Sequence, residues 1–332
     1  MEHLTKRIGR RILMTAESFR SDAHFSLYYA LLRIIDDFSS RLHFSKIACA
    51  AHTAKDNWII KTLTKQMLPV IEKYNNDQSS GCFEENAPIW ICWWTGEKTA
   101  PPLVKQCIKS IRAQAGTHPV YFIDQSTYMK YLKIPQYILQ KSEAGQMKLA
   151  HLADYIRVAL LYEYGGLWLD ATIFCANRIP ENYFSYPFFT CKSLTQSCGY
   201  LSQMRWTTFV FGGWKGNIIF RYLKEAFETY WKIYDRAIDY LFFDYLIEIA
   251  MRNLPAIKKY IDQVPVNNLH RDDLQAAMNR AEPAEQFDRI IQEDTVLYKL
   301  SWREQYSLET ACGRPSVYAY FIGGNFECVE DL

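Results

Sequence analysis

The stretch that decides the fold reads Leu149-Ala-His-Leu-Ala-Asp-Tyr-Ile-Arg-Val-Ala-Leu-Leu-Tyr-Glu-Tyr-Gly-Gly-Leu-Trp-Leu-Asp-Ala-Thr-Ile173. Its apolar residues recur at helical spacing as far as Tyr164, which predicts an amphipathic helix. Gly165 can end that helix in a left-handed conformation, and Gly166 lets the backbone turn. The next three residues are apolar and predict a short buried strand, after which Asp170 is the first charged residue.

Asp170 would lie where open α/β sheets bind their ligands, at the carboxyl end of a strand. Side-chain alternation along an extended segment puts Asp170 and Thr172 on one face. On the preceding helix, Asp154 and Arg157 are three residues apart and share a side with His151. Two interpretations stay open. These residues form one site, or Asp154 and Arg157 are a surface pair and Asp170 begins a turn.

Two segments resemble the signature of bacterial capsular polysaccharide synthesis glycosyltransferases. They are Ala-His-Leu-Ala-Asp-Tyr-Ile-Arg at 150–157 and Tyr-Glu-Tyr-Gly-Gly-Leu-Trp-Leu-Asp-Ala-Thr at 162–172. That family is akin to the DXD-type sugar transferases and, more distantly, to the glucosyltransferase domains of large clostridial toxins. The segments 89–96, 100–110 and Lys299-Leu300 resemble its first strand, the helix after it and its C-terminal motif, so the resemblance covers about residues 85 to 303.

The resemblance implies a GT-A-like fold, a UDP- or GDP-linked sugar donor, Mn²⁺ or Mg²⁺ as cofactor, and a glycan or lipid-linked acceptor. It implies that Asp170 binds the metal and the diphosphate, while Asp154 and Arg157 hold hydroxyls of the donor. The base would lie near the end of the first strand. The implied donor site comprises Trp93, Trp94, Thr95, Asp154, Arg157, Gly165, Gly166, Asp170 and Lys299. Kinship with the toxins favours retention of the anomeric configuration.

A divalent cation can stabilise the negative charge on a departing diphosphate. Mg²⁺ accepts one or two carboxylates besides phosphate oxygens and waters, so one aspartate can suffice. The predicted metal ligands are Asp170, Thr172 and His270. Thr172 stands where the stricter motif has a second aspartate, and a unit-charge pair about 4 Å apart is worth roughly 4 kcal/mol at an effective dielectric near 20. We therefore expect weakened metal binding unless another ligand compensates. Alternatively, His270 satisfies a loop backbone and Lys299 is a surface lysine that ends a strand.

Acidic and aromatic residues beyond position 200 are candidates for the acceptor side. Asp239 and Asp244 lie on an expected helix over 237–251, roughly 140° apart around it, so at most one should face the cleft. Trp206 and Trp214 stand beside glycines and a lysine, and they are the aromatics that we expect to be exposed to a sugar acceptor. The predicted catalytic residues are Asp170, Asp154, Arg157, Asp244 and Asp239.

The chain divides into a helical accessory region at 1–80, an α/β region at 85–305 and a C-terminal packing segment at 306–332. In the α/β region, expected strands alternate with expected helices. This alternation predicts a doubly wound, mostly parallel sheet with right-handed crossovers. The last helices before the C-terminal strand are expected at 217–234 and 237–251.

Composition and charge exclude several classes of protein. With 332 residues, 49% hydrophobic residues and a net charge of +2, the chain can build a core and carries too little charge for a nucleic-acid binder. A basic cluster, Lys6, Arg7, Arg10 and Arg11, either contacts anionic lipid or forms a solvated helix face. No segment has the pattern of a signal peptide or a bilayer span, and the nine cysteines predict buried free thiols. We expect a cytoplasmic protein, peripheral on the inner membrane face if the cluster binds lipid.

The leading hypothesis is a metal-dependent glycosyltransferase of capsular or exopolysaccharide synthesis. Because the second aspartate is missing, a second hypothesis is a degenerate protein that binds sugar nucleotides without turnover. A metal phosphohydrolase would need more clustered acids or histidines than the sequence offers. GxGxxG, Walker and GxSxG motifs are absent, which argues against dinucleotide, ATP and serine-hydrolase sites.

Overall fold

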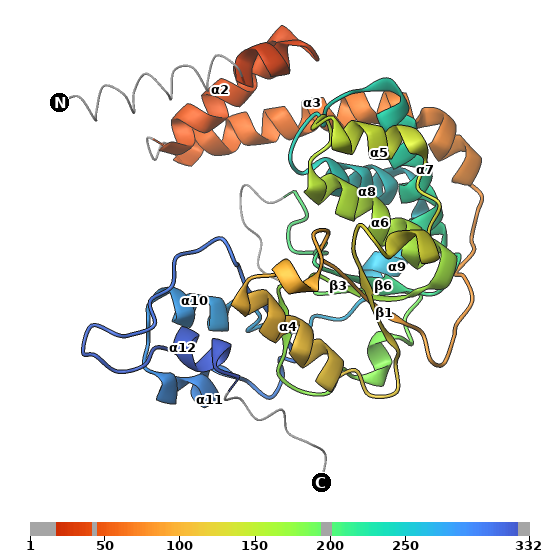
Figure 1. The fold of residues 1–332 in the computed structure, drawn as a ribbon. Coiled ribbons are helices and arrows are strands. Elements are labelled where there is room, and N and C mark those ends of the chain that lie inside the picture. The colour runs from red at the N-terminus through yellow and green to blue at the C-terminus, as the bar shows by residue number, and fades with distance from the viewer. Residues whose placement is uncertain (1–17, 42–44, 194–200, 325–332) are drawn as a thin grey trace, which may run out of the picture.

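The computed structural model describes residues 18–41, 45–193 and 201–324, and these form a mixed α/β chain around a five-stranded sheet (Figure 1). The strands lie in the order β2-β1-β3-β6-β5. Their bounds are Ile89–Cys92 (β1), Val120–Ile123 (β2), Gly166–Leu169 (β3), Phe188–Thr190 (β5) and Val210–Gly213 (β6). β1 is parallel to β2 and β3, whereas β6 is antiparallel to β3 and β5. The predicted mostly parallel sheet is confirmed, and β6 is the reversed strand within it.

Helices lie on both sides of this sheet, with α5, α6, α7 and α8 on one side and α4 on the other (Figure 1). Their bounds are Pro102–Ala113 (α4), Gln136–Glu143 (α5), Leu149–Tyr164 (α6), Ile218–Ile233 (α7), Phe242–Asn253 (α8) and Pro255–Gln263 (α9). The helix expected at 217–234 is confirmed as α7. The helix expected at 237–251 begins only at Phe242, because the residues before it form turns in which Asp239 accepts a hydrogen bond from the Leu241 amide (2.9 Å).

The deciding stretch folds as predicted. α6 buries Leu152, Ile156 and Leu160 in the core, and it ends at Gly165, whose φ is +67° and whose amide donates to the Leu161 carbonyl. Gly166, at φ +93°, turns the chain directly into β3. All four β3 residues are buried, so Asp170 follows a strand that the core holds rigidly.

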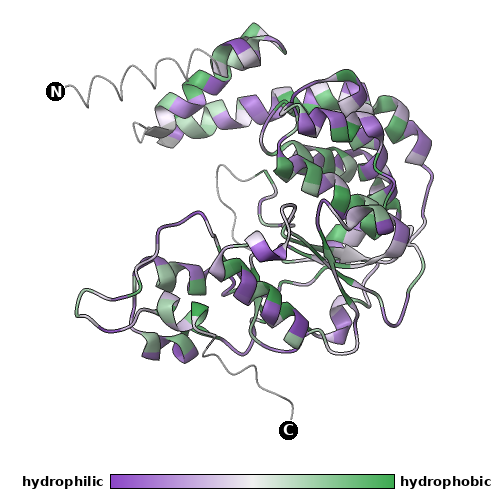
Figure 2. Cartoon of the chain, viewed as in Figure 1, coloured by the Kyte–Doolittle hydropathy of each residue, from purple (hydrophilic) through white to green (hydrophobic). Residues whose placement is uncertain are grey.

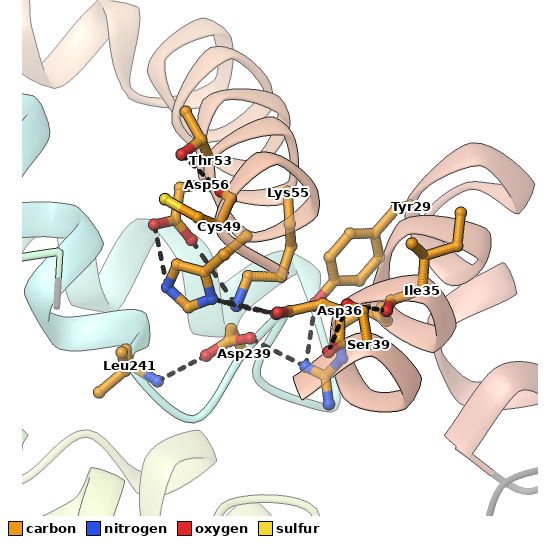
Figure 3. Close-up of polar contacts among 12 residues, drawn as sticks. Tyr29, Ile35, Asp36, Ser39, Cys49, Thr53, Lys55, Asp56, Asp239 and Leu241 are labelled. Atoms are coloured by element: carbon orange, nitrogen blue, oxygen red, sulfur yellow. Dashed lines mark hydrogen bonds and ion pairs between the residues drawn. The ribbon is translucent and has the colours of Figure 1, made fainter. Parts of the chain in front are cut away.

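In the N-terminal part, α3 (Ser45–Tyr74) packs beside α7 and α8, and α2 (Leu27–Arg41) packs on α3. The predicted stripe on α3 is buried in the main core and includes Ile59, Leu63, Met67 and Val70. Polar contacts attach α2 to the turn before α8: Tyr29 Oη donates to the Ile238 carbonyl (2.6 Å), and Arg33 donates to Asp239 (2.8 Å). In a second cluster, Lys55 of α3 contacts Asp36 of α2 (3.3 Å) and the adjacent Asp56 (3.7 Å) (Figure 3). The accessory region is therefore fastened to the α/β region.

The C-terminal part adds a small antiparallel sheet in which β4 (Ile173–Cys175) pairs with β7 (Leu297–Lys299). Short helices surround it: α10 (Asp273–Asn279), α11 (Phe287–Ile290) and α12 (Val317–Ile322). Four 3₁₀ turns in the described residues are Glu97–Thr99, Tyr128–Lys130, Glu181–Tyr183 and Ala284–Gln286. Val317 and Phe321 of α12 are buried. Because Lys299 pairs with Ile173, this sheet brings Lys299 next to the segment that follows Asp170.

Two expectations from composition can be compared with the described residues. No helix among them is both long and apolar enough to cross a bilayer. Their free cysteines are Cys82, Cys92, Cys107, Cys175, Cys191 and Cys312. Cys82 and Cys312 are exposed, so the expected burial is wrong at these two positions. Cys49 is disulfide-bonded, which contradicts the expected free thiol at that position. The proposed division at residues 1–80, 85–305 and 306–332 stays a prediction.

Candidate active site

Asp170 is held by three side chains at the carboxyl end of β3. Its Oδ1 accepts hydrogen bonds from Trp168 Nε1 (2.9 Å) and Arg157 Nη2 (3.3 Å), and its Oδ2 accepts one from Lys299 Nζ (2.9 Å). Its side chain is 29% exposed, so solvent and ligands can reach it. Burial raises the pKa of Asp170, but the charges of Lys299 and Arg157 outweigh burial and hold the pKa below its ordinary value. Asp170 is therefore ionised and paired with two cations.

Arg157 lies beneath Asp170 and connects it to Asp154. Its Nη1 donates to Asp154 Oδ1 (2.8 Å), one helical turn earlier on α6. The guanidinium lies 5.0 Å from the centre of the Trp168 ring and 5.5 Å from that of Phe243, and the side chain is only 5% exposed. Arg157 Nε is buried and has no hydrogen-bond partner among the described residues. Stacking and two ion pairs therefore fix this guanidinium in place.

Asp154 is the carboxyl with the most strongly altered pKa of this group. Burial raises its pKa to about 7, the Arg157 charge opposes that shift, and the nearby carboxylates Asp244 and Asp170 add to it. A carboxyl of that pKa exchanges protons near neutral pH. The interpretation of Asp154 and Arg157 as an isolated surface pair is wrong. Arg157 is 5% exposed and donates to Asp170, and the charge of Asp170 raises the pKa of Asp154.

Lys299 occupies the position that the sequence assigns to a metal. Its ammonium donates to both Asp170 Oδ2 (2.9 Å) and Thr172 Oγ1 (2.6 Å), so the two predicted ligands converge on one point that already holds a positive charge. A divalent cation about 3 Å from this ammonium would be repelled by roughly 10 kcal/mol at an effective dielectric near 20.

The other predicted metal ligands do not offset that repulsion. Thr172 contributes no charge, and His270 directs its Nδ1 to Asp273 (2.8 Å) with a side chain that is 43% exposed. No group of three His, Cys, Asp or Glu residues suited to a metal occurs in residues 18–41, 45–193 and 201–324. As arranged, these residues do not fit a divalent cation.

Of the two acceptor-side acids, Asp244 belongs to this group and Asp239 is engaged elsewhere. Asp244, in the first turn of α8, accepts from Trp206 Nε1 (2.9 Å) and influences the pKa of Asp154. Burial raises the pKa of Asp244 to about 6, against the opposing effects of Trp206 and Arg157. Asp239 pairs instead with Arg33 of α2 (2.8 Å). The structure thus distinguishes two acids that the sequence treated alike.

The two tryptophans predicted for the acceptor lie in different surroundings. Trp206 is 1% exposed, so the exposure on which its prediction rested is wrong, and its indole positions Asp244. Trp214 is partly exposed and donates to the Phe184 carbonyl (3.2 Å). It lines a small crevice with Gly165 and Gly166, at the opposite end of β3 from Asp170.

Packing accounts for the two glycines predicted to bind the donor. A Cβ on Gly166 would lie 2.0 Å from the Pro88 carbonyl oxygen, and one on Gly165 would lie 2.6 Å from the Lys215 nitrogen. Both glycines adopt positive φ. The two glycines therefore lie where the backbone passes close to the backbone at Pro88 and at Lys215, and they lie away from Asp170.

The end of β1 lies on the same edge of the sheet as Asp170. β1 and β3 are parallel neighbours in which Trp90 pairs with Trp168, so Cys92 is level with Asp170. Trp93 and Trp94 follow at once and are partly exposed, Trp93 packing edge-to-face on Trp302 (5.6 Å between ring centres). Thr95 is exposed beyond them. These positions suit the predicted contact with a planar base.

Sequence reasoning missed three aromatic residues of the site: Trp168, Phe209 and Phe243. Trp168 lies two residues before Asp170 on the same face of the strand, so the alternation that identified Thr172 would also have identified it. The Phe209 ring lies 5.1 Å from Lys299 Nζ, and the Phe243 ring lies beside Arg157. Both contacts join distant parts of the chain and leave no local signal in the sequence.

Comparisons with known proteins agree with the resemblance at the level of the family. A family model described as capsular polysaccharide synthesis protein matches residues 40–320. A curated relative, the O-glycosyltransferase PaGT of Phomopsis amygdali, is 26% identical over an alignment of 102 residues that covers 28% of this chain and 25% of that protein. The chain thus spans about a quarter of that relative's length. No solved structure matches. Because the family match covers most of its length, the chain belongs to the capsular polysaccharide synthesis protein family.

Proposed function

We propose that the protein transfers a sugar from a UDP- or GDP-linked donor to a glycan or lipid-linked acceptor, on a GT-A-like nucleotide-binding domain. The observation that carries the proposal is the convergence of five ionisable side chains at the carboxyl end of β3: Asp170, Asp154, Arg157, Asp244 and Lys299. The family match and the glycosyltransferase relative support the same reaction class.

The arrangement suggests a division of roles. Arg157 and Lys299 carry the positive charges that can bind the donor's diphosphate, and Trp93 and Trp94 lie where its base can stack. Asp154 and Asp244, whose pKa values burial raises to about 7 and about 6, are suited to exchange a proton with an acceptor hydroxyl. We propose retention of the anomeric configuration, which NMR of the first-formed product decides.

Replacing Asp170 with Asn tests the site. The substitution keeps the shape of the side chain and removes the charge that orients both Lys299 and Arg157, so we expect release of UDP or GDP from the cognate sugar nucleotide to fall at least about 100-fold, a barrier increase of roughly 3 kcal/mol. Asp262→Asn is the matched control, since Asp262 is an exposed partner of Lys258 on α9. Undiminished turnover in Asp170→Asn would refute the proposal. Nucleotide binding by the wild type without turnover of any donor would favour the degenerate binding protein.

We further propose that the protein works at the cytoplasmic face of a membrane, where a lipid-linked acceptor would be found. The predicted basic cluster at Lys6, Arg7, Arg10 and Arg11 lies outside the described residues. Along α2, hydrophobic and hydrophilic residues alternate (Figure 2). The polar contacts of Figure 3 fasten one side of α2, and an exposed apolar stripe on its other side supports the proposal: Leu27, Tyr28, Leu31, Ile35 and Phe38. An exposed apolar helix face is typical of helices that lie at the surface of a bilayer, and basic residues add attraction to anionic lipid.

Flotation with lipid vesicles tests this contact. We expect the wild type to float with vesicles that contain phosphatidylglycerol and to remain below with phosphatidylcholine alone. Arg10→Ala with Arg11→Ala, or Leu31→Ser with Ile35→Ser, should abolish flotation. Leu269→Ser, at an exposed leucine elsewhere, should leave it unchanged. A wild type that floats with neither vesicle contradicts the proposal, and stripe variants that change only the oligomeric state would show that a second copy covers the stripe.

A further inference from the structure

We infer that the Lys299 ammonium supplies the positive charge expected of a divalent cation, so that the donor's diphosphate binds and departs without a metal. The inference rests on the proposed function. It changes the role of Asp170 from metal ligand to the group that positions Lys299.

The first support is the position of the ammonium. Nζ bridges Asp170 Oδ2 and Thr172 Oγ1, the two oxygens that the sequence pattern assigns to a cation. A threonine is a poor substitute for an aspartate as a metal ligand, but its hydroxyl is a good acceptor for an ammonium N–H. The replacement of the expected second aspartate by Thr172 is thus explained by the lysine opposite it.

The second support is the way the backbone fixes Lys299. Its amide donates to the Arg271 carbonyl (2.8 Å), and the Leu300 amide donates to the Thr172 carbonyl (2.9 Å). The β4–β7 pairing therefore ties Lys299 to the segment that carries Thr172. The Phe209 ring lies under the ammonium, 5.1 Å from Nζ. Such a charge is preorganised, which is what stabilisation of a developing anion requires.

The third support is unused donor capacity. A lysine ammonium has three N–H donors. Lys299 uses one on Asp170 and one on Thr172, and no further acceptor lies within hydrogen-bond distance among the described residues. Its side chain is 26% exposed, so a phosphate oxygen can reach it. Arg157 donates to the other oxygen of Asp170 (3.3 Å) and so leaves this ammonium donor unopposed.

This arrangement accounts for the charge in the transfer step. As the bond between the anomeric carbon and the terminal diphosphate oxygen breaks, its electron pair stays on that oxygen, and the acceptor oxygen forms the new bond to the anomeric carbon. The acceptor's proton passes to a carboxylate of the site or to the departing phosphate. Lys299 and Arg157 stabilise the negative charge left on the diphosphate.

Calorimetric titration of the full chain with UDP and with GDP, in EDTA and in Mn²⁺, tests the inference. The wild type should bind one of these nucleotides in EDTA, with an affinity within about threefold of that in Mn²⁺. Lys299→Gln should weaken binding about 10- to 100-fold, as expected for the loss of a charged hydrogen bond, and Mn²⁺ should not restore it. Lys299→Arg keeps the charge and should retain most of the affinity. Lys258→Gln, at an exposed lysine of α9, is the control and should bind like the wild type.

The outcomes separate the inference from the proposed function. Binding that requires Mn²⁺, or binding in EDTA that Lys299→Gln leaves unchanged, overturns the inference while the site stays a nucleotide site. Absence of binding to either nucleotide under both conditions overturns the proposed function itself. If Lys299→Gln does not fold, the wild type in EDTA and the Lys299→Arg variant still decide the question.

Discussion

Replacing Arg157 with Met should destabilise the protein in a way that depends on pH. The substitution keeps much of the side chain's length between Trp168 and Phe243 but removes the charge that Asp154 and Asp170 share. Removing one partner of a buried ion pair costs about 3–5 kcal/mol, because the other charge stays buried without compensation. Asp154 is 15% exposed and Asp170 keeps Lys299, so we expect the lower end, about 3 kcal/mol at pH 8.

Acid should relieve this loss. The folded-state pKa of Asp154 is already raised to about 7, and Arg157 is a group that lowers it, so the variant's pKa should be higher still. A carboxyl whose folded pKa exceeds its unfolded value opposes folding when it is ionised and ceases to do so once protonated. At pH 5.5 Asp154 of the variant should be protonated, and the destabilisation should fall to less than half of its value at pH 8.

Urea unfolding of wild type and variant at both pH values measures the effect. Arg112→Met is the matched control. Arg112 makes two shorter contacts to Glu97, 2.6 and 2.7 Å, but at 44% exposure, and exposed pairs contribute about 0–1 kcal/mol. A loss below about 1 kcal/mol in Arg157→Met at pH 8, or an equal loss at both pH values, would refute the account of a buried charge cluster.

Two further predictions follow from the same geometry. If Asp244 takes up the proton of the acceptor hydroxyl, kcat/KM should rise with pH through about 6, because the carboxyl is protonated below that pKa and cannot take up another proton. Asp244→Asn should remove this rise. A variant with an unchanged pH profile excludes Asp244 from that role. Gly166→Ala should cost more than about 4 kcal/mol, or prevent folding, because its Cβ would lie 2.0 Å from the Pro88 oxygen. Gly216→Ala, at φ +73° with no atom within 4 Å, should cost only about 1–2 kcal/mol, and similar losses in the two variants would show that packing does not select Gly166.

Much of the site's location followed from local pattern. The periodicity of α6, the glycines after it and the apolar run before Asp170 predicted a helix, a turn and a strand whose carboxyl end bears a charge, and each is confirmed. The spacing of Asp154 and Arg157 predicted that they share a face, as their 2.8 Å contact shows. Hydrophobic periodicity and side-chain alternation act over a few residues, so one sequence suffices to read them.

Contacts between residues far apart in the sequence could not be predicted from local pattern. Asp239 and Asp244 were equivalent in the sequence, and only the packing of α2 against the turn before α8 pairs one with Arg33 and leaves the other beside Arg157. Trp206, expected to be exposed, is buried and donates to Asp244, 38 residues away along the chain, a contact that no local pattern reveals.

By itself, the sequence determined the helix–turn–strand unit, the mostly parallel sheet and the acidic residue at its edge. Tertiary structure alone decided which charge meets Asp170. Lys299 is 129 residues away along the chain, and it reaches Asp170 and Thr172 because β7 pairs with β4. The electrostatic character of the site depends on that pairing, since the strength of a charge contact is set by distance in space and not by separation along the chain.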